Sequence, residues 1–346
     1  MKVRKAMRRR LAAVVVVVGL VGLAGCGGGD GGSTASSSSG GAKLSKVSLG
    51  FSAWPGWFPW QVAEEKGIFT KHGLDVDLRY FESYTDSLNA LATGNIDGNS
   101  QTLNDTISSV SGGSKQSIVL TNDNSTGNDQ IIVAPGIAKV DDLKGKAVAI
   151  EEGTVDHYLL LLGLQRAGLG PSDIDLKPLP TADAAAAFAS GQVDAVGAFS
   201  PFTDTAITRE GSKVLFSSAD FPGAIPDHLV MDSSFVQKRP ADVQKLIDAW
   251  FETLDYIAAN RDQATAIMAK RAGVSVDAYR AYDAGTTLFT VADNVEAFTP
   301  GNDQKHLDHV AKQIVALLLD SKLIDTAPDL TGMFDPTFVK ARAAVG

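Results

Sequence analysis

Two kinds of hydrophobic pattern alternate along the chain from about residue 45 to residue 228. Short runs rich in β-branched residues, such as KVSLGF at 46–51 and DVDLRYF at 75–81, are typical of strands. Segments of helix length lie between such runs, for example TDSLNALATGN at 85–95 and DHYLLLLGLQRAG at 156–168. This alternation predicts an α/β fold with mostly parallel sheets that helices cover on both faces.

The other predicted elements continue the same order. The further strand-like runs are SIVLT, QIIVA, KAVAI, IDLKPL, DAVGAF and KVLFS, and the further helices are WQVAEEKGIFTKHG and ADAAAAFASG. After DHLVMD at 227–232 the pattern changes, and only helix-like segments follow. We therefore expect two β/α sets of similar size, near 45–133 and 134–228, and a helical tail that packs against one of them.

The N-terminal residues read as a targeting segment. Residues 1–25 combine six basic side chains with an apolar run that is too short for a membrane span, which is the pattern of a signal peptide. The run ends in LAGC, which resembles a bacterial lipobox, so we expect lipidation at Cys26; the alternative is an incidental cysteine after an ordinary secretory signal. Residues 26–43 are rich in Gly and Ser and predict a flexible tether.

Charge and cysteine content exclude several classes of protein. Removal of residues 1–25 changes the formal net charge from −9 to −15, because this segment has six basic and no acidic residues. Such an acidic chain argues against a nucleic-acid partner and against charge-driven binding to an anionic membrane. Cys26 is the only cysteine, so an internal disulfide and a cysteine-based metal or catalytic site are excluded.

A cluster of aromatic residues stands out in GFSAWPGWFPWQ at 50–61, which holds three of the four tryptophans. Pro55, Gly56 and Pro59 interrupt regular structure there. We expect Trp54 and Trp57 to face a ligand cleft. The other two tryptophans, Trp60 and Trp250, are expected in the core.

Four separated segments resemble one known family. They are WPGWFPWQVAEEKGIFTKHGLDVDLRYF, SLNALATGNIDG, VDDLKGKAVAIEEGTVDHYLLL and AFASGQVDAVGAFSPF. In this order they resemble the solute-binding proteins of ABC importers in the nitrate, taurine, alkanesulfonate and thiamine-precursor group.

The resemblance implies a type II periplasmic-binding-protein fold, in which two lobes joined by two crossing strands close on a small solute. It places 44–133 and 229–346 in the first lobe and 134–228 in the second. It also implies a monomer, held outside the cell by a lipid at Cys26, that delivers its solute to an ABC permease and its ATPase.

The loops expected at the strand ends carry charges of one sign. They contain no Lys or Arg, but they hold eleven acidic residues: Glu82, Asp86, Asp105, Asp123, Asp129, Glu151, Glu152, Asp156, Asp204, Asp220 and Asp227. Asp86 and Asp156 are equally well explained as helix caps, and Asp204 and Asp220 as solvated rim. The ligand-binding candidates are Trp54, Trp57, Phe58, Glu82, Asp105, Asp123, Thr154, Asp156, His157, Phe199 and Asp227.

Carboxylates beside indole rings favour a cation or zwitterion as the ligand. Guanidine is the most specific ligand hypothesis, and other small amines are the next candidates. The resemblance keeps taurine, an aliphatic sulfonate or nitrate as the alternative, although Asp156 lies where related proteins offer an anion site. Thr154 and His157 keep part of that pattern; His157 either bonds the ligand or packs under the loop.

A role as an enzyme is disfavoured. The five histidines show no HExxH spacing, and no GxSxG or phosphate-binding loop occurs. His306 and His309 share a helix face that we interpret as solvated surface, so neither a metal nor a cofactor is expected. Pyrimidine binding or synthesis, as in the thiamine-precursor relatives, is a remote alternative.

We predict that Trp57→Ala and Asp105→Ala each weaken ligand binding and leave the fold intact. Calorimetry with guanidinium, taurine, an alkanesulfonate and nitrate measures the binding, and circular dichroism checks the fold. Tight binding of an anion that has no amine would contradict the charge argument.

Overall fold

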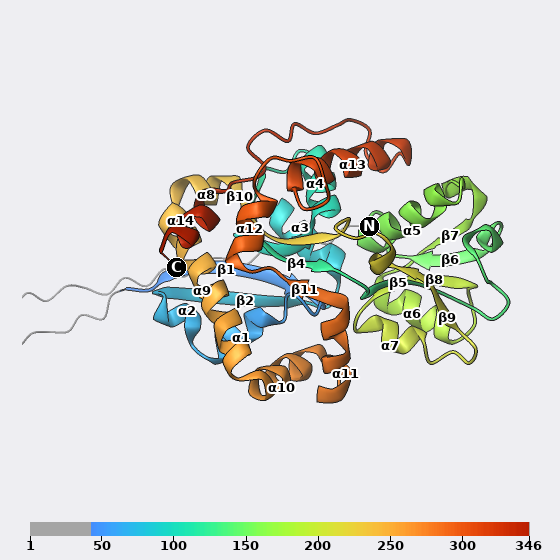
Figure 1. The fold of residues 1–346 in the computed structure, drawn as a ribbon, viewed down its shortest axis with the longest axis horizontal. Coiled ribbons are helices and arrows are strands. Elements are labelled where there is room, and N and C mark those ends of the chain that lie inside the picture. Colours follow the sequence, from blue (N-terminus) through green and yellow to red (C-terminus); the bar gives the residue numbers. More distant parts are fainter. Residues whose placement is uncertain (1–42, 346) are drawn as a thin grey trace, which may run out of the picture. The chain divides into compact units, whose positions relative to one another are not determined.

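A computed structural model describes residues 43–345. The predicted signal peptide, Cys26 and the tether up to residue 42 lie outside the described residues. Within 43–345, no helix has the length and apolar character needed to cross a bilayer. Figure 1 shows the two β-sheets around which the described residues fold.

The first sheet has six strands in the order β11-β4-β10-β3-β1-β2. These strands are β1 (Ser45–Ser52), β2 (Leu74–Phe81), β3 (Gly98–Thr102), β4 (Gln116–Ser125), β10 (Pro226–Asp232) and β11 (Thr286–Leu288). The helices that accompany it are α1 (Pro59–Glu65), α2 (Ile68–Lys71), α3 (Tyr84–Ala92), α4 (Leu103–Ser111), α8 (Ser233–Lys238), α9 (Pro240–Ala259), α10 (Arg261–Ala272), α11 (Val276–Ala281), α12 (Val291–Ala297), α13 (Leu307–Asp320) and α14 (Thr337–Val345). We call this sheet with these helices the first lobe.

The second sheet has five strands in the order β7-β6-β8-β5-β9. These strands are β5 (Asp129–Val133), β6 (Ala147–Ile150), β7 (Asp175–Pro178), β8 (Ala195–Phe199) and β9 (Lys213–Ser217). In Figure 1, α5 (Val155–Arg166) covers one face of this sheet, and α6 (Thr181–Ala189) and α7 (Phe202–Ala206) cover the other. We call this sheet with these helices the second lobe. Short 3₁₀ turns complete the chain: η1 (Val140–Leu143), η2 (Pro171–Asp173), η3 (Ser218–Asp220) and η4 (Tyr282–Gly285).

The α/β fold is as expected, but the sheets are mixed rather than mostly parallel. β1 runs parallel to β2 and β3, and β6 runs parallel to β7 and β8. β10 runs antiparallel to β3 and β4, and β5 runs antiparallel to β8 and β9. These two reversed strands are the ones that enter each sheet when the chain passes from one lobe to the other, so no crossover helix sets their direction.

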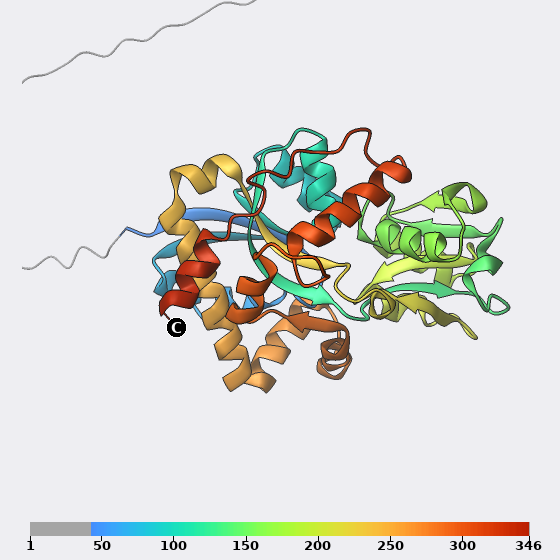
Figure 2. The same ribbon diagram turned by 45° about the horizontal axis from the view of Figure 1, so that its top comes forward.

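The chain passes from the first lobe to the second between β4 and β5, and returns before β10. All residues of β5 pair within the second sheet, although the expected boundary at residue 133 placed them in the first lobe. The tail helices return to the first lobe (Figure 2), where α14 packs beside α9 and α12.

Trp60 forms the aromatic centre of the first-lobe core. Its ring lies 4.5 Å from that of Trp250 and stacks on Phe69 at 5.9 Å, and its Nε1 donates to Ser100 Oγ at 2.9 Å. Trp60 and Trp250 are both fully buried, which confirms that these two tryptophans belong to the core. Ser100 lies in β3, a strand that the hydrophobic pattern did not reveal because it reads GNSQT.

We predict that Trp60→Ala lowers the free energy of unfolding by about 3–5 kcal/mol, because a fully buried aromatic ring leaves a cavity. Trp60→Phe keeps most of the ring and loses the bond to Ser100, so we expect a smaller loss of about 1–3 kcal/mol. Urea denaturation measures both values. Equal losses for the two variants would contradict this account of the core.

Candidate functional site

A small cavity lies between the two lobes. It is lined from the first lobe by Ala53, Trp54, Trp57, Tyr84, Thr102 and Asp227, and from the second by Asp129, Val155 and Phe199. Its volume is about 10 Å³. A single water molecule needs about 10–15 Å³, so the lobes in this structure are closed almost completely on the side chains that line the cavity.

Four aromatic rings form a closed circuit around the cavity. Ring centroids are separated by 6.4 Å for Trp54 and Trp57, 5.5 Å for Trp57 and Tyr84, 6.3 Å for Tyr84 and Phe199, and 6.3 Å for Phe199 and Trp54. All four side chains are buried. We call these residues the aromatic cage. Because Phe199 belongs to the second lobe, the cage is complete only when the lobes are together.

The tight turn after β1 places both tryptophans of the cage. The backbone N–H of Trp57 donates to the carbonyl of Trp54 at 3.0 Å, and Trp54 Nε1 donates to Asp123 Oδ1 at 2.9 Å. A Cβ atom at Gly56 would lie 1.9 Å from Asp123 Oδ2, so only glycine lets the turn approach this carboxyl group. Asp123 thus fixes the position of Trp54 in the cage through the hydrogen bond from its indole N–H.

Six carboxyl groups are buried around this cavity. They are Asp105, Asp123, Asp129, Glu151, Asp156 and Asp227, each at most 6% exposed. Among residues 43–345, no Lys or Arg is buried, so these acids have no buried cationic partner. A buried charge without a partner is expensive, so each of these acids must hold a proton, receive a cation from outside or have its oxygens satisfied by hydrogen-bond donors.

Burial raises the pKa of these carboxyl groups. Desolvation raises the pKa of Asp105, Asp123 and Asp129 to about 7 in each case. It raises the pKa of Asp156 and Asp227 well above the usual range, and neighbouring carboxyl groups add to the effect. Asp123 and Asp227 lie opposite each other in the β4–β10 ladder, so this pair shares protons more readily than it carries two charges.

Several of these oxygens have no hydrogen-bond partner. The unpaired buried atoms near the cavity include Asp123 Oδ2, Asp129 Oδ2, Asp156 Oδ1 and both carboxyl oxygens of Asp227. Native proteins rarely leave buried polar atoms unpaired. Of the described side chains that line the cavity, Trp57 Nε1 is the one unpaired donor. When these acids are ionised, the site therefore has far more acceptors than donors, and each proton that they hold turns one oxygen into a donor.

Asp105 supports the cage and does not line the cavity. Its Oδ2 accepts hydrogen bonds from Tyr84 at 2.8 Å and from Thr102 at 2.5 Å, and its Oδ1 accepts one from Asn104 at 3.0 Å. Tyr84 is therefore held by Asp105 much as Trp54 is held by Asp123.

The structure places other candidate residues away from the cavity. Phe58 is fully buried in the first-lobe core against Phe51 and Tyr279. Glu82 is exposed in a neighbouring groove. Thr154 donates to the carbonyl oxygen of Glu151 at 2.8 Å, within its own loop.

His157 packs under the loop that precedes α5. Its Nδ1 accepts a hydrogen bond from the Gly153 N–H at 3.2 Å, and burial lowers its pKa to about 4. A neutral ring in this position favours the packing role over ligand contact. Asp204, interpreted as solvated rim, is exposed and also accepts a 2.6 Å hydrogen bond from Tyr282.

The sequence reasoning missed five residues that line the cavity: Ala53, Tyr84, Thr102, Asp129 and Val155. Asp129 belonged to the acidic set at the strand ends, and Tyr84 follows Glu82 in FESY, so both lay beside recognised signals. The small or apolar residues Ala53 and Val155 give no signal in a single sequence.

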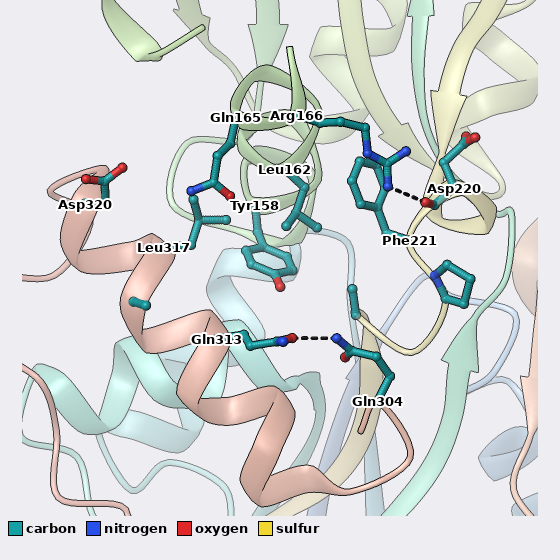
Figure 3. Close-up of a pocket in the computed structure, with 13 residues that line it drawn as sticks. Tyr158, Leu162, Gln165, Arg166, Asp220, Phe221, Gln304, Gln313, Leu317 and Asp320 are labelled. Atoms are coloured by element: carbon teal, nitrogen blue, oxygen red, sulfur yellow. Dashed lines mark hydrogen bonds between the residues drawn. The ribbon is translucent and has the colours of Figure 1, made fainter. Parts of the chain in front are cut away.

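A larger groove of about 770 Å³ lies elsewhere between α5 and α13 (Figure 3). Arg166 donates to the backbone oxygen of Asp220 within the second lobe, and Gln304 donates to Gln313 within the first. None of the unpaired buried side-chain atoms described above lies in its lining. The groove therefore lacks the features that mark the smaller cavity as the candidate site.

Sequence comparisons connect the chain with known binding proteins. The model of the NMT1-like family matches residues 40–273. A putative binding protein of Brucella abortus is 32% identical over 213 residues, which make up 60% of this chain and 66% of that protein. The taurine-binding periplasmic protein of Escherichia coli is 28% identical over 211 residues, which cover 59% of this chain and 64% of that protein. The match thus spans just under two thirds of these relatives.

Structural comparison gives the same picture. The crystal structure of the periplasmic aliphatic sulphonate binding protein of Escherichia coli aligns with a TM-score of 0.70 and 25% identity. The alignment covers 84% of this chain and 92% of that one. This likeness confirms the expected fold class.

We predict that Gly56→Ala lowers the free energy of unfolding by about 1–3 kcal/mol, because its methyl group collides with the Asp123 carboxyl group. Gly170→Ala is the matched control: Gly170 has a φ of −129°, and nothing lies within 4 Å of its added Cβ. Chemical denaturation of both variants measures the difference. A Gly56→Ala variant as stable as the control would show that the turn does not depend on this approach.

Proposed function

Because the chain belongs to the NMT1-like family, whose model matches residues 40–273, we propose that it is the solute-binding component of an ABC importer. It binds its solute outside the cytoplasm and delivers it to a permease and its ATPase. The relatives reported above are all named as binding proteins, and the role proposed here is binding rather than catalysis.

The proposed ligand is a small nitrogen-containing cation or zwitterion. The observation that carries this proposal is the set of six buried carboxyl groups without a buried Lys or Arg in residues 43–345. A cation that carries several N–H groups supplies both the missing charge and the missing hydrogen-bond donors. The unpaired oxygens of Asp129, Asp156 and Asp227 are its natural partners.

The aromatic cage supports the same ligand class. A cation gains about 0.5–2 kcal/mol from contact with an aromatic face, and indole is the best such partner. A planar guanidinium group can lie on one ring face while its edge donates two parallel hydrogen bonds to a carboxylate. Guanidinium is therefore the first ligand to test, with small amines next.

The second candidate is taurine, an aliphatic sulfonate or nitrate, and the names of the relatives favour it. An anion would need donors, and the described side chains that line the cavity offer the unpaired N–H of Trp57 and, only while they hold protons, the O–H groups of Asp129 and Asp227. Taurine is the best fit within this group, because its ammonium could meet the acids.

The proposed mechanism of capture is lobe closure. The cage takes rings from both lobes, so a ligand bound inside it stabilises the closed arrangement, and the permease distinguishes the closed from the open form. We further propose that the protein is a monomer anchored to the membrane by a lipid on Cys26.

We predict that affinity for guanidinium increases with pH across the range of about 5 to 8, by about tenfold per pH unit for each proton released. The cation binds ionised carboxylates, and among its proposed partners Asp129 has a pKa of about 7, while burial raises the pKa of Asp156 and Asp227 well above the usual range. Calorimetry at several pH values, in buffers of different ionisation enthalpy, measures the affinity and counts the protons. An anionic ligand would show the opposite trend.

The buried carboxyl groups should make the stability of the ligand-free protein depend on pH. The folded state holds protons on Asp105, Asp123 and Asp129 that the unfolded state has lost above about pH 4. The free energy of unfolding of the empty protein should therefore decrease as pH rises from about 4 to about 7.

Failure of every cation to bind at pH 8, together with binding of an alkanesulfonate, would overturn the proposed ligand class.

A further inference from the structure

Glu151 joins the two lobes beside the cavity. It follows β6 in the second lobe and is 6% exposed. Its Oε1 accepts hydrogen bonds from the first lobe, from Thr85 Oγ1 at 2.5 Å and from the Thr85 N–H at 3.3 Å. Its Oε2 accepts two from the second lobe, from Thr181 Oγ1 at 2.6 Å and from the Thr181 N–H at 3.1 Å.

These contacts distinguish Glu151 from the acids whose oxygens have no hydrogen-bond partner. All four contacts are donors to the carboxylate, and both of its oxygens are used, which is the arrangement that an acceptor-only, ionised group requires. Asp129, Asp156 and Asp227 instead keep unpaired oxygens. Glu151 is thus satisfied by the protein alone.

A hydrogen-bond chain connects this junction with the ligand site. Thr181 Oγ1 also lies 3.3 Å from Asp156 Oδ2, and its single proton already serves Glu151. The second contact is satisfied when a protonated Asp156 donates to Thr181, which agrees with the raised pKa of Asp156. A cation bound at the unpaired Asp156 Oδ1 displaces this proton, so Asp156 no longer donates to Thr181, and occupancy of the cavity acts on the chain Asp156–Thr181–Glu151–Thr85.

We propose that Glu151 is a positioning residue that couples occupancy of the cavity to closure of the lobes through its bonds to Thr85 at the start of α3. The proposal rests on the proposed function in that it assumes a solute between the lobes. Opening the lobes must break the two Thr85 contacts, and these contacts lie on the same helix as Tyr84 of the cage. The junction therefore holds the cage shut and governs release of the solute.

Thr85→Val tests this directly. Thr85 is exposed, so the variant should fold, and it removes the hydroxyl donor without touching Glu151 or the cavity. We expect the dissociation rate of guanidinium to rise by about tenfold to one-hundredfold, since the lost bond is to a charged group. The ratio of affinities for guanidinium and ammonium should stay at the wild-type value, because no ligand contact changes. Glu151→Gln, which replaces one acceptor oxygen with a donor, should show the same pattern.

Thr93→Val is the matched control. Thr93 lies just beyond the end of α3, and its hydroxyl donates to carbonyl oxygens of that helix and accepts from Asn95 Nδ2, all within the first lobe. Stopped-flow release of guanidinium should be unchanged in this variant. Wild-type release rates in both Thr85→Val and Glu151→Gln would overturn the proposal.

Two further readouts separate this proposal from the ligand assignment. If the wild-type protein binds taurine and not guanidinium, the cation assignment fails, and taurine release by Thr85→Val then tests the junction. Small-angle scattering without ligand adds a test that needs no solute: Thr85→Val should have a larger radius of gyration than the wild type and Thr93→Val. Equal radii together with equal release rates would show that the junction does not hold the lobes.

Discussion

The burial of six carboxyl groups around one small cavity is the constraint on which the site depends. No buried Lys or Arg in residues 43–345 compensates them, so the empty protein must keep several of them protonated. A cation that binds in the cavity would therefore displace protons from these carboxyl groups. It also explains the supporting bonds: Asp123 fixes Trp54 and Asp105 fixes Tyr84, so these acids set the geometry of the aromatic cage as well as its charge.

The division into two lobes makes this arrangement possible. The acids come from both lobes, Asp227 from the first and Asp129 and Asp156 from the second, so separating the lobes exposes them to water and lowers the cost of their ionisation. In the proposed function, a solute that neutralises them brings the lobes together again. Glu151 differs from the other acids because its partners are donors on both sides of the junction. Closure thus involves two kinds of carboxyl group, one that needs a ligand and one that does not.

The comparison with sulfonate and taurine binders separates what family members share, the fold, from what can differ between them, the ligand. The fold is shared with the aliphatic sulphonate binding protein at a TM-score of 0.70. The charge inside the cavity is a property of particular side chains, and it changes by substitution without any change in topology. A common fold and a different ligand are therefore compatible.

The sequence by itself determined the α/β architecture, the two β/α sets and the acidic strand ends, because these follow from local periodicity and from residue type. It also separated Trp60 and Trp250, which lie in the core, from Trp54 and Trp57, which line the cavity. It missed β3, whose residues Asn99, Ser100 and Gln101 are fully buried yet polar, since their hydrogen bonds come from distant segments. Only the tertiary structure decided which acids line the cavity: Asp129 and Asp227 are brought to it from different sheets, Glu82 is left at the surface, and Asp105 is turned to Tyr84. Contacts of this kind join residues far apart in the chain, and no local pattern records them.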